Sequence, residues 1–404
     1  MLIKRKEFLQ LGSLATASLM VPKFLKAFEK VDRVPPGNKV IVVLQLSGGN
    51  DGLNTVIPIR NDIYYRERPK LGIEKTKALR LTDEVALHPA LTAFHELYDN
   101  GNIGILNGVG YPNPDRSHFR SMDIWQTGSA SNEYVTTGWI GRYLDAQCNG
   151  CDRPTYALEI DDILSLALKG EHSKAIAMKD PKRLFGTSNE NFFRDILKDH
   201  KAAQRAASES DEIADYLYKT VSETLSSATY IFEESRMHPS SADYPRTELG
   251  NGLKTIASLI FSDINTKVYY ISLGSFDTHV NQEMQQQRLF TELSDATRAF
   301  TKDLKNNNRF DDVLLFTFSE FGRRVSQNAS GGTDHGTANN MFLIGGALKQ
   351  TGIINSLPDL HDLDDGDLKY RIDFKAVYAT VLKNWLQADD AAILGKKYDY
   401  LGFC

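Results

Sequence analysis

Residues 39–52 read KVIVVLQLSGGNDG, an apolar run that ends in a small polar turn. The run over 39–46 is rich in valine and leucine and has the length of a strand buried on both faces. The turn places Asn50 and Asp51 just beyond the carboxyl end of that strand. Ligands of open α/β sheets bind beyond the carboxyl ends of the strands, so this stretch predicts a sheet with a site at its edge.

Three more polar clusters adjoin apolar runs elsewhere in the chain. Ionisable side chains are the common feature of all three, and they include the oxygen and nitrogen ligands that zinc or manganese takes. A strand-like run over 267–273 precedes Ser275-Phe276-Asp277-Thr278-His279, a run over 313–318 precedes Ser319-Glu320-Phe321-Gly322-Arg323-Arg324, and Gly332-Thr333-Asp334-His335-Gly336-Thr337-Ala338-Asn339 precedes a run over 341–344.

Each cluster also has a purely structural explanation. Gly, Asn and Asp are common in turns, so the segment 47–52 also fits a plain turn after a buried strand. Glu320 beside two arginines fits a surface salt-bridge cluster, and Asp334-His335 fits a helix cap with a hydrogen-bonded histidine. Asp277 and His279 directly after a strand are harder to explain by turn chemistry. Four such clusters at one predicted sheet edge favour a functional site.

Length and composition narrow the class of protein. The chain has 404 residues, of which 41% are hydrophobic and 25% charged, enough to bury a large core. The net charge is -5 and the pI is near 6.0, whereas nucleic-acid-binding proteins are usually basic. We therefore expect no nucleic-acid partner.

Strand-like and helix-like segments alternate along the chain, which predicts an α/β fold with a mostly parallel central sheet and helices on both faces. One helix is expected over 281–304. Residues 151–250 carry none of the four clusters and are predicted to form a helical cap or insertion in a single domain over 38–404. Helical spacing supports that insertion at Ile213, Leu217, Val221, Leu225, Ala228 and Phe232, and a last helix at Phe374, Val377, Tyr378, Val381, Leu382 and Trp385.

Residues 1–30 are expected to form an export signal with its lead-in. A basic start at residues 4–6 precedes a mildly apolar stretch over 9–21, which is too short for an ordinary transmembrane helix. The start resembles a twin-arginine signal, with Lys6 where the second arginine belongs. Ala15-Thr16-Ala17 offers a small-residue cleavage pattern. A retained anchor and an amphipathic helix are the alternatives. No other apolar segment is long enough to span a membrane, and we expect a periplasmic or cell-envelope location.

Three cysteines do not make a disulfide scaffold in a chain of this length. Cys148 and Cys151 have the spacing of a redox motif but lie in a turn-like Asn-Gly context. A local disulfide in an exported loop is the expectation for this pair.

Taken together, these motifs resemble one known family. The sequence is similar to the bacterial domain of unknown function family 1501, which is grouped with the alkaline-phosphatase-like enzymes, and the resemblance covers essentially the whole chain after the signal. The segments that carry it are the four clusters above together with Asp115-Arg116-Ser117-His118-Phe119 and Trp125-Gln126-Thr127-Gly128.

The resemblance implies a site with one or two divalent ions, zinc or manganese. Its expected nucleophile is Ser117, which precedes a helix predicted over 118–126 and faces a helix start that favours anions. His118 is a candidate general acid, and a packed structural histidine is its alternative. The implied metal ligands are Asp51, Asp277, His279, Glu320, Asp334 and His335, and the implied substrate-binding residues are Asn50, Arg116, Arg120 and Arg323.

Two departures from the wider superfamily concern the metal ligands. Asp277 and His279 are two residues apart where the superfamily has a spacing of four, and Ser319-Glu320 stands where it has an Asp-His pair. The last histidine of the superfamily lies before another strand, and His335 matches that place. The ligand set is thus reduced by at least one histidine, which favours one metal ion over two.

The function expected from these residues is an exported metal-dependent hydrolase of a phosphate or sulfate ester, with a small molecule or glycan as substrate. Either Ser117 attacks the ester and forms a covalent intermediate, or metal-bound water attacks directly. The alternative class is a non-catalytic exported protein that keeps the fold and binds a protein partner or a glycan. Convergence of the ligands and Ser117 on one point distinguishes the enzyme from the binding protein.

Overall fold

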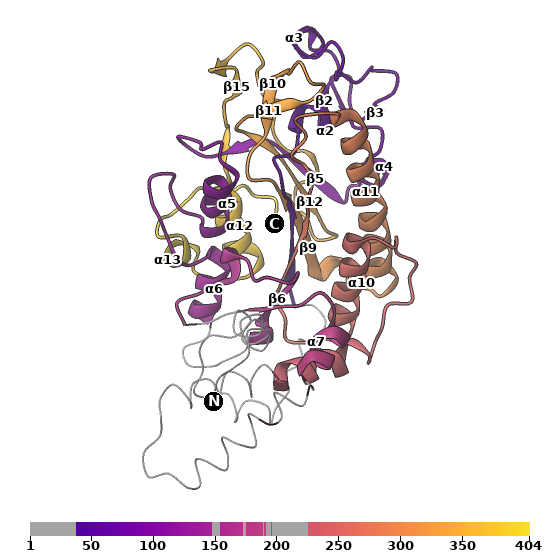
Figure 1. Cartoon of the computed structure of the whole chain (residues 1–404), viewed down its shortest axis with the longest axis vertical. Helices are drawn as coiled ribbons and strands as arrows, with labels where there is room; N and C mark the ends of the chain where they lie inside the picture. The colour runs from indigo at the N-terminus through magenta and orange to yellow at the C-terminus, as the bar shows by residue number, and fades with distance from the viewer. Residues whose placement is uncertain (1–37, 148–153, 173–174, 189, 191–194, 196–224) are drawn as a thin grey trace. The chain divides into compact units, whose positions relative to one another are not determined.

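The computed structural model describes residues 38–147, 154–172, 175–188, 190, 195 and 225–404 (Figure 1). The chain divides into two compact units. The larger unit comprises residues 37–135, 242–254 and 271–404, and among the described residues the smaller unit draws on 136–241 and 255–270. Every residue predicted for the site belongs to the larger unit.

The strand predicted from the opening stretch lies in the sheet of the larger unit. It is β1 (Val40–Leu46), all of whose residues are buried. β1 pairs in parallel with β9 (Val313–Phe318), in a register that runs from Val40 opposite Val313 to Gln45 opposite Phe318. The carboxyl ends of the two strands therefore lie side by side, although they are more than 260 residues apart in sequence.

The other strands of this sheet continue from β9. β12 (Asn339–Ile344) is antiparallel to β9 and to β5 (Ile103–Gly110). β5 in turn pairs in parallel with β13 (Gly352–Ile353) and β16 (Ile372–Asp373). The sheet is mixed but mostly parallel, which confirms the predicted fold class.

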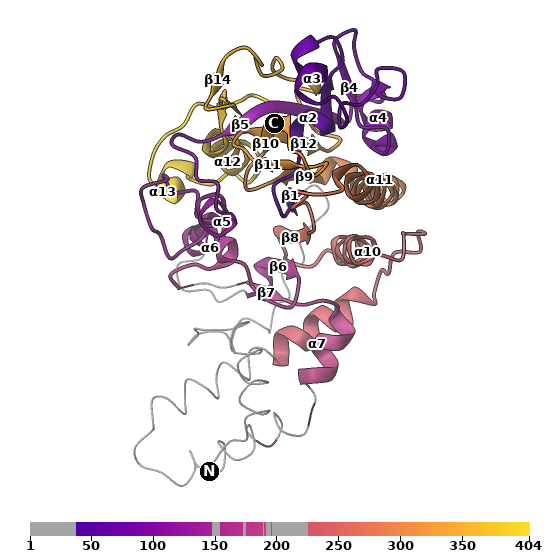
Figure 2. The ribbon, with the colours of Figure 1, turned by 45° about the horizontal axis from the view of Figure 1, so that its top comes forward.

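Helices cover both faces of this sheet (Figures 1 and 2). On one face lie α5 (His118–Thr127) and α12 (Phe374–Thr380), and a π-helical turn over Val381–Trp385 continues α12. Trp125 stacks on Phe318, with ring centroids 5.3 Å apart, and on Phe374 at 4.2 Å. The aromatic side chains of the two helices and β9 thus form one packed layer.

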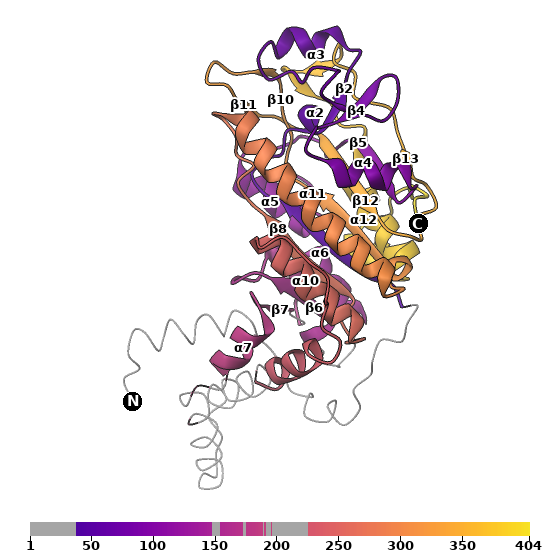
Figure 3. The ribbon, with the colours of Figure 1, turned by 90° about the vertical axis from the view of Figure 1, so that its right-hand side faces the viewer.

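The opposite face carries α4 (Thr92–Asp99) and α11 (Gln282–Asn306), which run alongside each other (Figure 3). Phe94 of α4 meets Phe342 of β12 edge to face at 4.9 Å. The side chain of Ser294 on α11 accepts a hydrogen bond from the backbone N–H of Ala93 at 2.9 Å. Both the helix predicted over 281–304 and the last helix are therefore confirmed.

Short elements surround the sheet of the larger unit. A small antiparallel sheet, two hairpins and short helices make up this group: α2 (Gly52–Thr55), β2 (Val56–Pro58), α3 (Asp62–Glu67), β3 (Leu79–Arg80), β4 (Val85–Leu87), β10 (Arg323–Gln327), β11 (Thr333–His335), β14 (Leu363–Asp364), β15 (Asp367–Leu368) and α13 (Asp390–Leu394). α2, α3 and the β10–β11 hairpin gather at one end of the sheet (Figures 1 and 3).

The smaller unit contains a parallel pair of strands and several helices. β6 (Ala157–Ile160) pairs in parallel with β7 (Ile176–Ala177). In the sequence, α6 (Trp139–Gln147) precedes this pair and α7 (Pro181–Ser188) follows it. The 3-10 turns Pro154–Tyr156 and Leu166–Leu168 complete it. β8 (Val268–Leu273) and α10 (Glu248–Phe261) are divided between the two units, after Tyr270 and Lys254.

Several predictions fall outside the described residues. The export signal over 1–30 and the Cys148–Cys151 pair lie there, as does much of the helical pattern of the insertion. Residues 225–235 are helical, in agreement with the end of that pattern. The boundaries proposed for the insertion stay a prediction. Among the described helices, none combines the length and the apolar character that crossing a membrane requires.

Candidate metal centre

Four side chains converge beyond the carboxyl ends of the strands. Asp277 and His279 follow β8, His118 begins α5, and His335 ends β11. The Nε2 atoms of His279 and His335 each lie 3.2 Å from Asp277 Oδ1 and 2.9 Å from each other. The Nε2 atom of His118 lies 3.5 Å from Asp277 Oδ2.

Each of the three imidazoles is oriented by an acceptor at its other nitrogen. His118 Nδ1 lies 2.9 Å from Glu320 Oε1, and His279 Nδ1 lies 3.2 Å from Asp334 Oδ1. The Nδ1 of His335 lies 2.8 Å from the backbone oxygen of Arg116. Each Nδ1 therefore faces an oxygen that can accept a hydrogen bond, and the Nε2 atoms lie on the side of Asp277, where His335 Nε2 is 3.2 Å from Asp277 Oδ1.

This donor set fits a zinc ion. Three imidazole nitrogens and one carboxylate are zinc ligands, and tetrahedral zinc at ordinary bond lengths places its ligand atoms roughly 3.3 Å apart. One ligand atom from each of His118, Asp277 and His335 lies within 4.8 Å of the other two, and His279 Nε2 lies 3.2 Å from Asp277 Oδ1. The acceptors behind the histidines are the outer partners that fix ring orientation in protein metal sites.

The charges of these groups suit metal binding near neutral pH. Burial alone would raise the pKa of Asp277, but hydrogen bonds from Arg323 and His335 lower it to about 2, so the carboxylate is ionised. Burial lowers the pKa of His335, which keeps that ring neutral. The hydrogen bond to Glu320 raises the pKa of His118 against the opposing effect of burial, and so makes that ring a stronger base.

Arg323 is a structural anchor of the site. Its side chain is fully buried, and its Nη2 atom donates to Asp277 Oδ1 at 2.8 Å. The remaining bonds go to backbone oxygens of three loops: Gly48 at 2.5 Å, Gly49 at 2.6 Å, Phe276 at 3.0 Å and Thr333 at 3.0 Å. With its donors engaged in this way, Arg323 holds the site together and is not exposed to a substrate.

The turn after β1 packs directly against Asp277 and Glu320. Gly48 donates its backbone N–H to Glu320 Oε1 at 2.8 Å, and it adopts a φ of 119°. A Cβ at Gly48 would lie 2.4 Å from the backbone nitrogen of Asp277, and one at Gly49 would lie 2.2 Å from the ring of Phe321. Glycine is therefore required at both positions.

Asp51 lies outside the histidine cluster. Its Oδ2 atom accepts from Arg68 Nη1 at 2.5 Å and from Gln282 Nε2 at 2.5 Å, and its Oδ1 atom caps α2 through the N–H groups of Leu53 and Asn54. The side chains of Asp51 and Arg68 are both fully buried. Asp51 as a metal ligand stays a prediction, and in this structure both of its oxygens are already bound by protein donors.

The structure places the other predicted residues around the cluster. Ser117 is exposed at the N-cap of α5 next to His118, and its side chain makes no capping hydrogen bond. Arg116 forms an ion pair with buried Asp367. Arg120 donates to the backbone oxygens of residues 130, 131 and 133, so substrate binding by Arg120 would require those bonds to break. Asn50 is buried, and its Nδ2 atom donates to Thr55.

The structure brings Asp277, His279 and His335 close together and places His118 beside Asp277, and the role of these side chains as metal ligands stays a prediction. Glu320 and Asp334 contact histidine Nδ1 atoms, so they act from behind the rings. Arg68 and Gln282, which bind Asp51, were missed because neither lies in a polar cluster after a strand.

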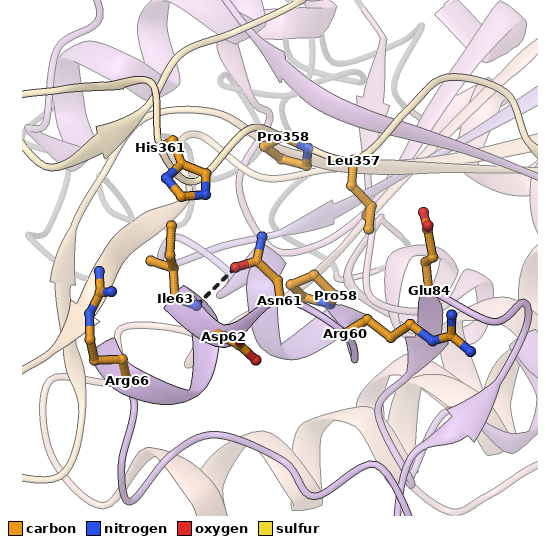
Figure 4. Close-up of a pocket in the computed structure, with 10 residues that line it drawn as sticks. All are labelled: Pro58, Arg60, Asn61, Asp62, Ile63, Arg66, Glu84, Leu357, Pro358 and His361. Atoms are coloured by element: carbon orange, nitrogen blue, oxygen red, sulfur yellow. Dashed lines mark hydrogen bonds between the residues drawn. The ribbon is translucent and has the colours of Figure 1, made fainter.

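A cavity of about 600 Å³ opens elsewhere in the larger unit (Figure 4). None of the cluster residues lines it. Its wall comprises Pro58, Arg60, Asn61, Asp62, Ile63, Arg66, Glu84, Leu357, Pro358 and His361.

The fold and the site define an α/β protein with a histidine-rich centre of the kind that holds a metal ion. The chain belongs to the family described as Protein of unknown function (DUF1501), whose model matches residues 38–391. Among the curated proteins, none matches this sequence.

Several solved structures are similar at a distance. The C-terminal periplasmic domain of EcEptC from Escherichia coli is 11% identical with a TM-score of 0.38, and the match covers 90% of each chain. The PsFucS1 sulfatase from Pseudoalteromonas sp. is 11% identical with a TM-score of 0.38, covering 97% of this chain and 72% of that one. A protein in the alkaline phosphatase superfamily from Vibrio parahaemolyticus is 10% identical with a TM-score of 0.33, covering 97% and 78%. The assignment of function therefore rests on the geometry of the site.

Proposed function

We propose that this protein is an exported zinc-dependent hydrolase that cleaves a phosphate or sulfate ester of a small molecule or glycan. The observation that carries the proposal is the set of three histidines whose Nδ1 atoms are held by acceptors and whose Nε2 atoms converge on Asp277. We assign the metal ligands to His118, Asp277, His279 and His335, and we assign Asp51 to the structural ion pair with Arg68.

A zinc ion at this position would polarise an ester oxygen and supply a nucleophile at neutral pH. The protein groups leave the centre open on one side, because 48% of the Asp277 side chain and 41% of the His279 side chain are exposed. A substrate can therefore approach the donor atoms. The side chain of Arg116 is 39% exposed near the start of α5, where its guanidinium pairs with Asp367.

Ser117 is the proposed nucleophile on the protein. Its position directly before His118 places it beside the donor cluster, and the start of α5 favours an anionic substrate there. Direct attack by water is the competing route. Both routes need zinc for turnover, but only the covalent route needs Ser117.

Metal content of the full chain tests the centre. We expect one equivalent of zinc by elemental analysis of the wild type, and loss of that zinc in Asp277→Ala and His335→Ala. His238→Ala is the matched control, because His238 is exposed and lies outside the cluster. A folded wild type that takes up neither zinc nor manganese would contradict the proposal.

Turnover of aryl phosphate and aryl sulfate esters then tests the activity. Ser117→Ala that keeps zinc and loses turnover would support the covalent route, and unchanged turnover would support direct attack by water. Zinc without turnover on any ester would favour the second candidate function, a non-catalytic binding protein. The buried Asp51–Arg68 pair is the observation that favours this candidate, because it occupies an acidic residue expected at the metal site.

A further inference from the structure

The cavity shown in Figure 4 lies within the larger unit and is separate from the histidine cluster. Its volume of about 600 Å³ is typical of a pocket for a small molecule. Its apolar surface comes from Pro58, Ile63, Leu357 and Pro358. Leu357 and Pro358 are half-buried and offer a surface without hydrogen-bonding groups, whereas Pro58 and Ile63 are buried beneath it.

One end of the cavity is rich in donors. Arg66 and His361 stand on the same side of it, and the ring of His361 points inward (Figure 4). Arg66 uses its Nε atom to bind Glu67 at 3.2 Å, and within the described chain no ion pair engages its Nη atoms. Asn61 accepts from the N–H of Ile63 through Oδ1 at 3.0 Å, which leaves its Nδ2 donor to face the cavity.

The other end has mixed charge. Glu84 and Arg60 line it, and Arg60 lies 4.0 Å from Asp83, a loose surface pair. A carboxylate and a guanidinium in one wall can bind the hydroxyl groups of a sugar, because the carboxylate accepts hydrogen bonds and the guanidinium donates them. The carboxylate of Asp62 points away from His361 and Leu357 (Figure 4).

The wall of the cavity is preformed. Ile63 belongs to a buried apolar cluster with Ile57, Tyr64 and Leu360. The far end of α3 is fixed by Arg68, which donates to Asp51 and to the backbone oxygens of residues 324 and 325. The backbone that carries Arg66 is therefore fixed before a ligand binds, whereas the side chain of Arg66 itself is 68% exposed.

We propose that this cavity binds one acidic sugar residue, a pyranose that carries a carboxylate or a sulfate. The anionic group lies between Arg66, His361 and the Nδ2 atom of Asn61, where charge-assisted hydrogen bonds are available. The ring lies over Leu357 and Pro358, and its hydroxyl groups reach Arg60 and Glu84. This site holds a ligand independently of the metal centre.

Titration of the full chain with three probes tests the proposal: galacturonic acid, galactose 6-sulfate and neutral galactose, each followed by NMR or calorimetry. We expect saturable binding of at least one acidic sugar, and at least about tenfold weaker binding of galactose, which lacks the anion. Binding of galacturonic acid alone would identify the carboxylate as the recognised group, and binding of galactose 6-sulfate alone would identify the sulfate.

Variants locate the bound sugar. Arg66→Ala should weaken binding at least about tenfold, whereas Arg288→Ala, which removes an exposed arginine of α11 outside the cavity, should leave it unchanged. Asp277→Ala should also leave it unchanged. If Asp277→Ala lost sugar binding and Arg66→Ala kept it, the sugar would lie at the metal centre. That result would overturn the cavity proposal without affecting the proposed hydrolase. Failure of both acidic sugars to bind, or equal binding of galactose, would overturn it as well.

Discussion

Single side chains of this protein join segments that are distant in the sequence. Arg323 binds the loops after β1, β8 and β10 through one buried guanidinium. Arg68 joins the end of α3 to the start of α2 in the same way. Removing one partner of a buried pair leaves an uncompensated charge, so these residues are more costly to lose than the surface ion pairs of the molecule.

The residues behind the histidines provide a test of the metal centre at this scale. Asp334 holds His279 Nδ1, and 60% of its side chain is exposed, so Asp334→Ala should fold normally. We expect its zinc dissociation constant to rise about tenfold, as is common when an outer partner is removed. A competition titration with a chelator measures this. Asp399→Ala removes an exposed carboxylate elsewhere, and an equal loss of affinity in that control would contradict the assigned role.

Glu159 gives a pH-dependent prediction. Burial raises the pKa of Glu159 from 4.5 to about 8, although hydrogen bonds from Ser165 partly offset it. The folded protein thus keeps a proton that the unfolded chain loses above pH 4.5. This contribution to stability is complete below the unfolded pKa and is lost as pH rises toward the folded pKa.

We expect the free energy of unfolding to fall by at most about 1.4 kcal/mol per pH unit between those two pKa values, on account of Glu159. Glu159→Gln should remove that part of the slope. Urea unfolding of both proteins across this range measures it, and parallel curves would show that Glu159 is not protonated in the folded state.

Residue types and spacing predicted part of the candidate site. Asp277, His279 and His335 were identifiable because ionisable groups adjoining an apolar strand are unusual. The side of each ring on which a carboxylate lies was not predictable, since it depends on which nitrogen of the ring meets an acceptor. Glu320 looked like a ligand from its place after β9, and only the fold shows His118 standing in front of it.

Among the elements, the turn between β1 and α2 packs closely against the site. It places Gly48 against Asp277 and Gly49 against Phe321. The same turn donates a hydrogen bond from Asn50 N to Ser319 Oγ at 2.9 Å, which ties it to the end of β9. The position of Asp277 and Glu320 thus depends on the shape of a short glycine turn.

We expect Gly48→Ala to lower the free energy of unfolding by about 2 kcal/mol or more, because the new Cβ meets the backbone of residue 277 and φ is positive. Zinc affinity should fall as well. Gly331→Ala is the matched control: φ is 73° and nothing lies within 4 Å of its Cβ, so it should cost only about 1 kcal/mol. Denaturant unfolding compares the two, and equal losses would mean that the turn can shift away from the new methyl group.

The strands and helices themselves were largely predictable. The runs that became β1, β8 and β9 are rich in β-branched and aromatic residues, and α12 has a helical apolar stripe. The direction of β12 was not predictable, because an apolar run has the same composition in parallel and antiparallel pairing. The π-helical turn after α12 likewise follows from packing rather than from local sequence.

At the scale of the whole molecule, the proposed zinc site connects distant parts of the larger unit. Its ligands come from segments near residues 118, 277 and 335. An ion that binds the folded chain and not the unfolded chain stabilises it by about 2.7 kcal/mol when its free concentration is one hundred times the dissociation constant.

We therefore expect chelation to lower the melting temperature by several degrees, and added zinc to restore it. Differential scanning calorimetry of the full chain measures the shift. Asp277→Ala should melt at one temperature with and without zinc. A shift that persists in this variant would mean that zinc stabilises the chain from another site.

The pairing of β1 with β9 also bears on how the chain is made. Val40 cannot meet its partner Val313 until more than 270 further residues have been synthesised. At roughly 5–20 residues per second, the ribosome needs about 14–55 s to cover that interval. The edge of β1 that pairs with β9 stays open for that long, although β8, its other neighbour, is made earlier. Nascent chains arrested before β8 should therefore be digested by protease within β1, whereas the released chain should be protected there.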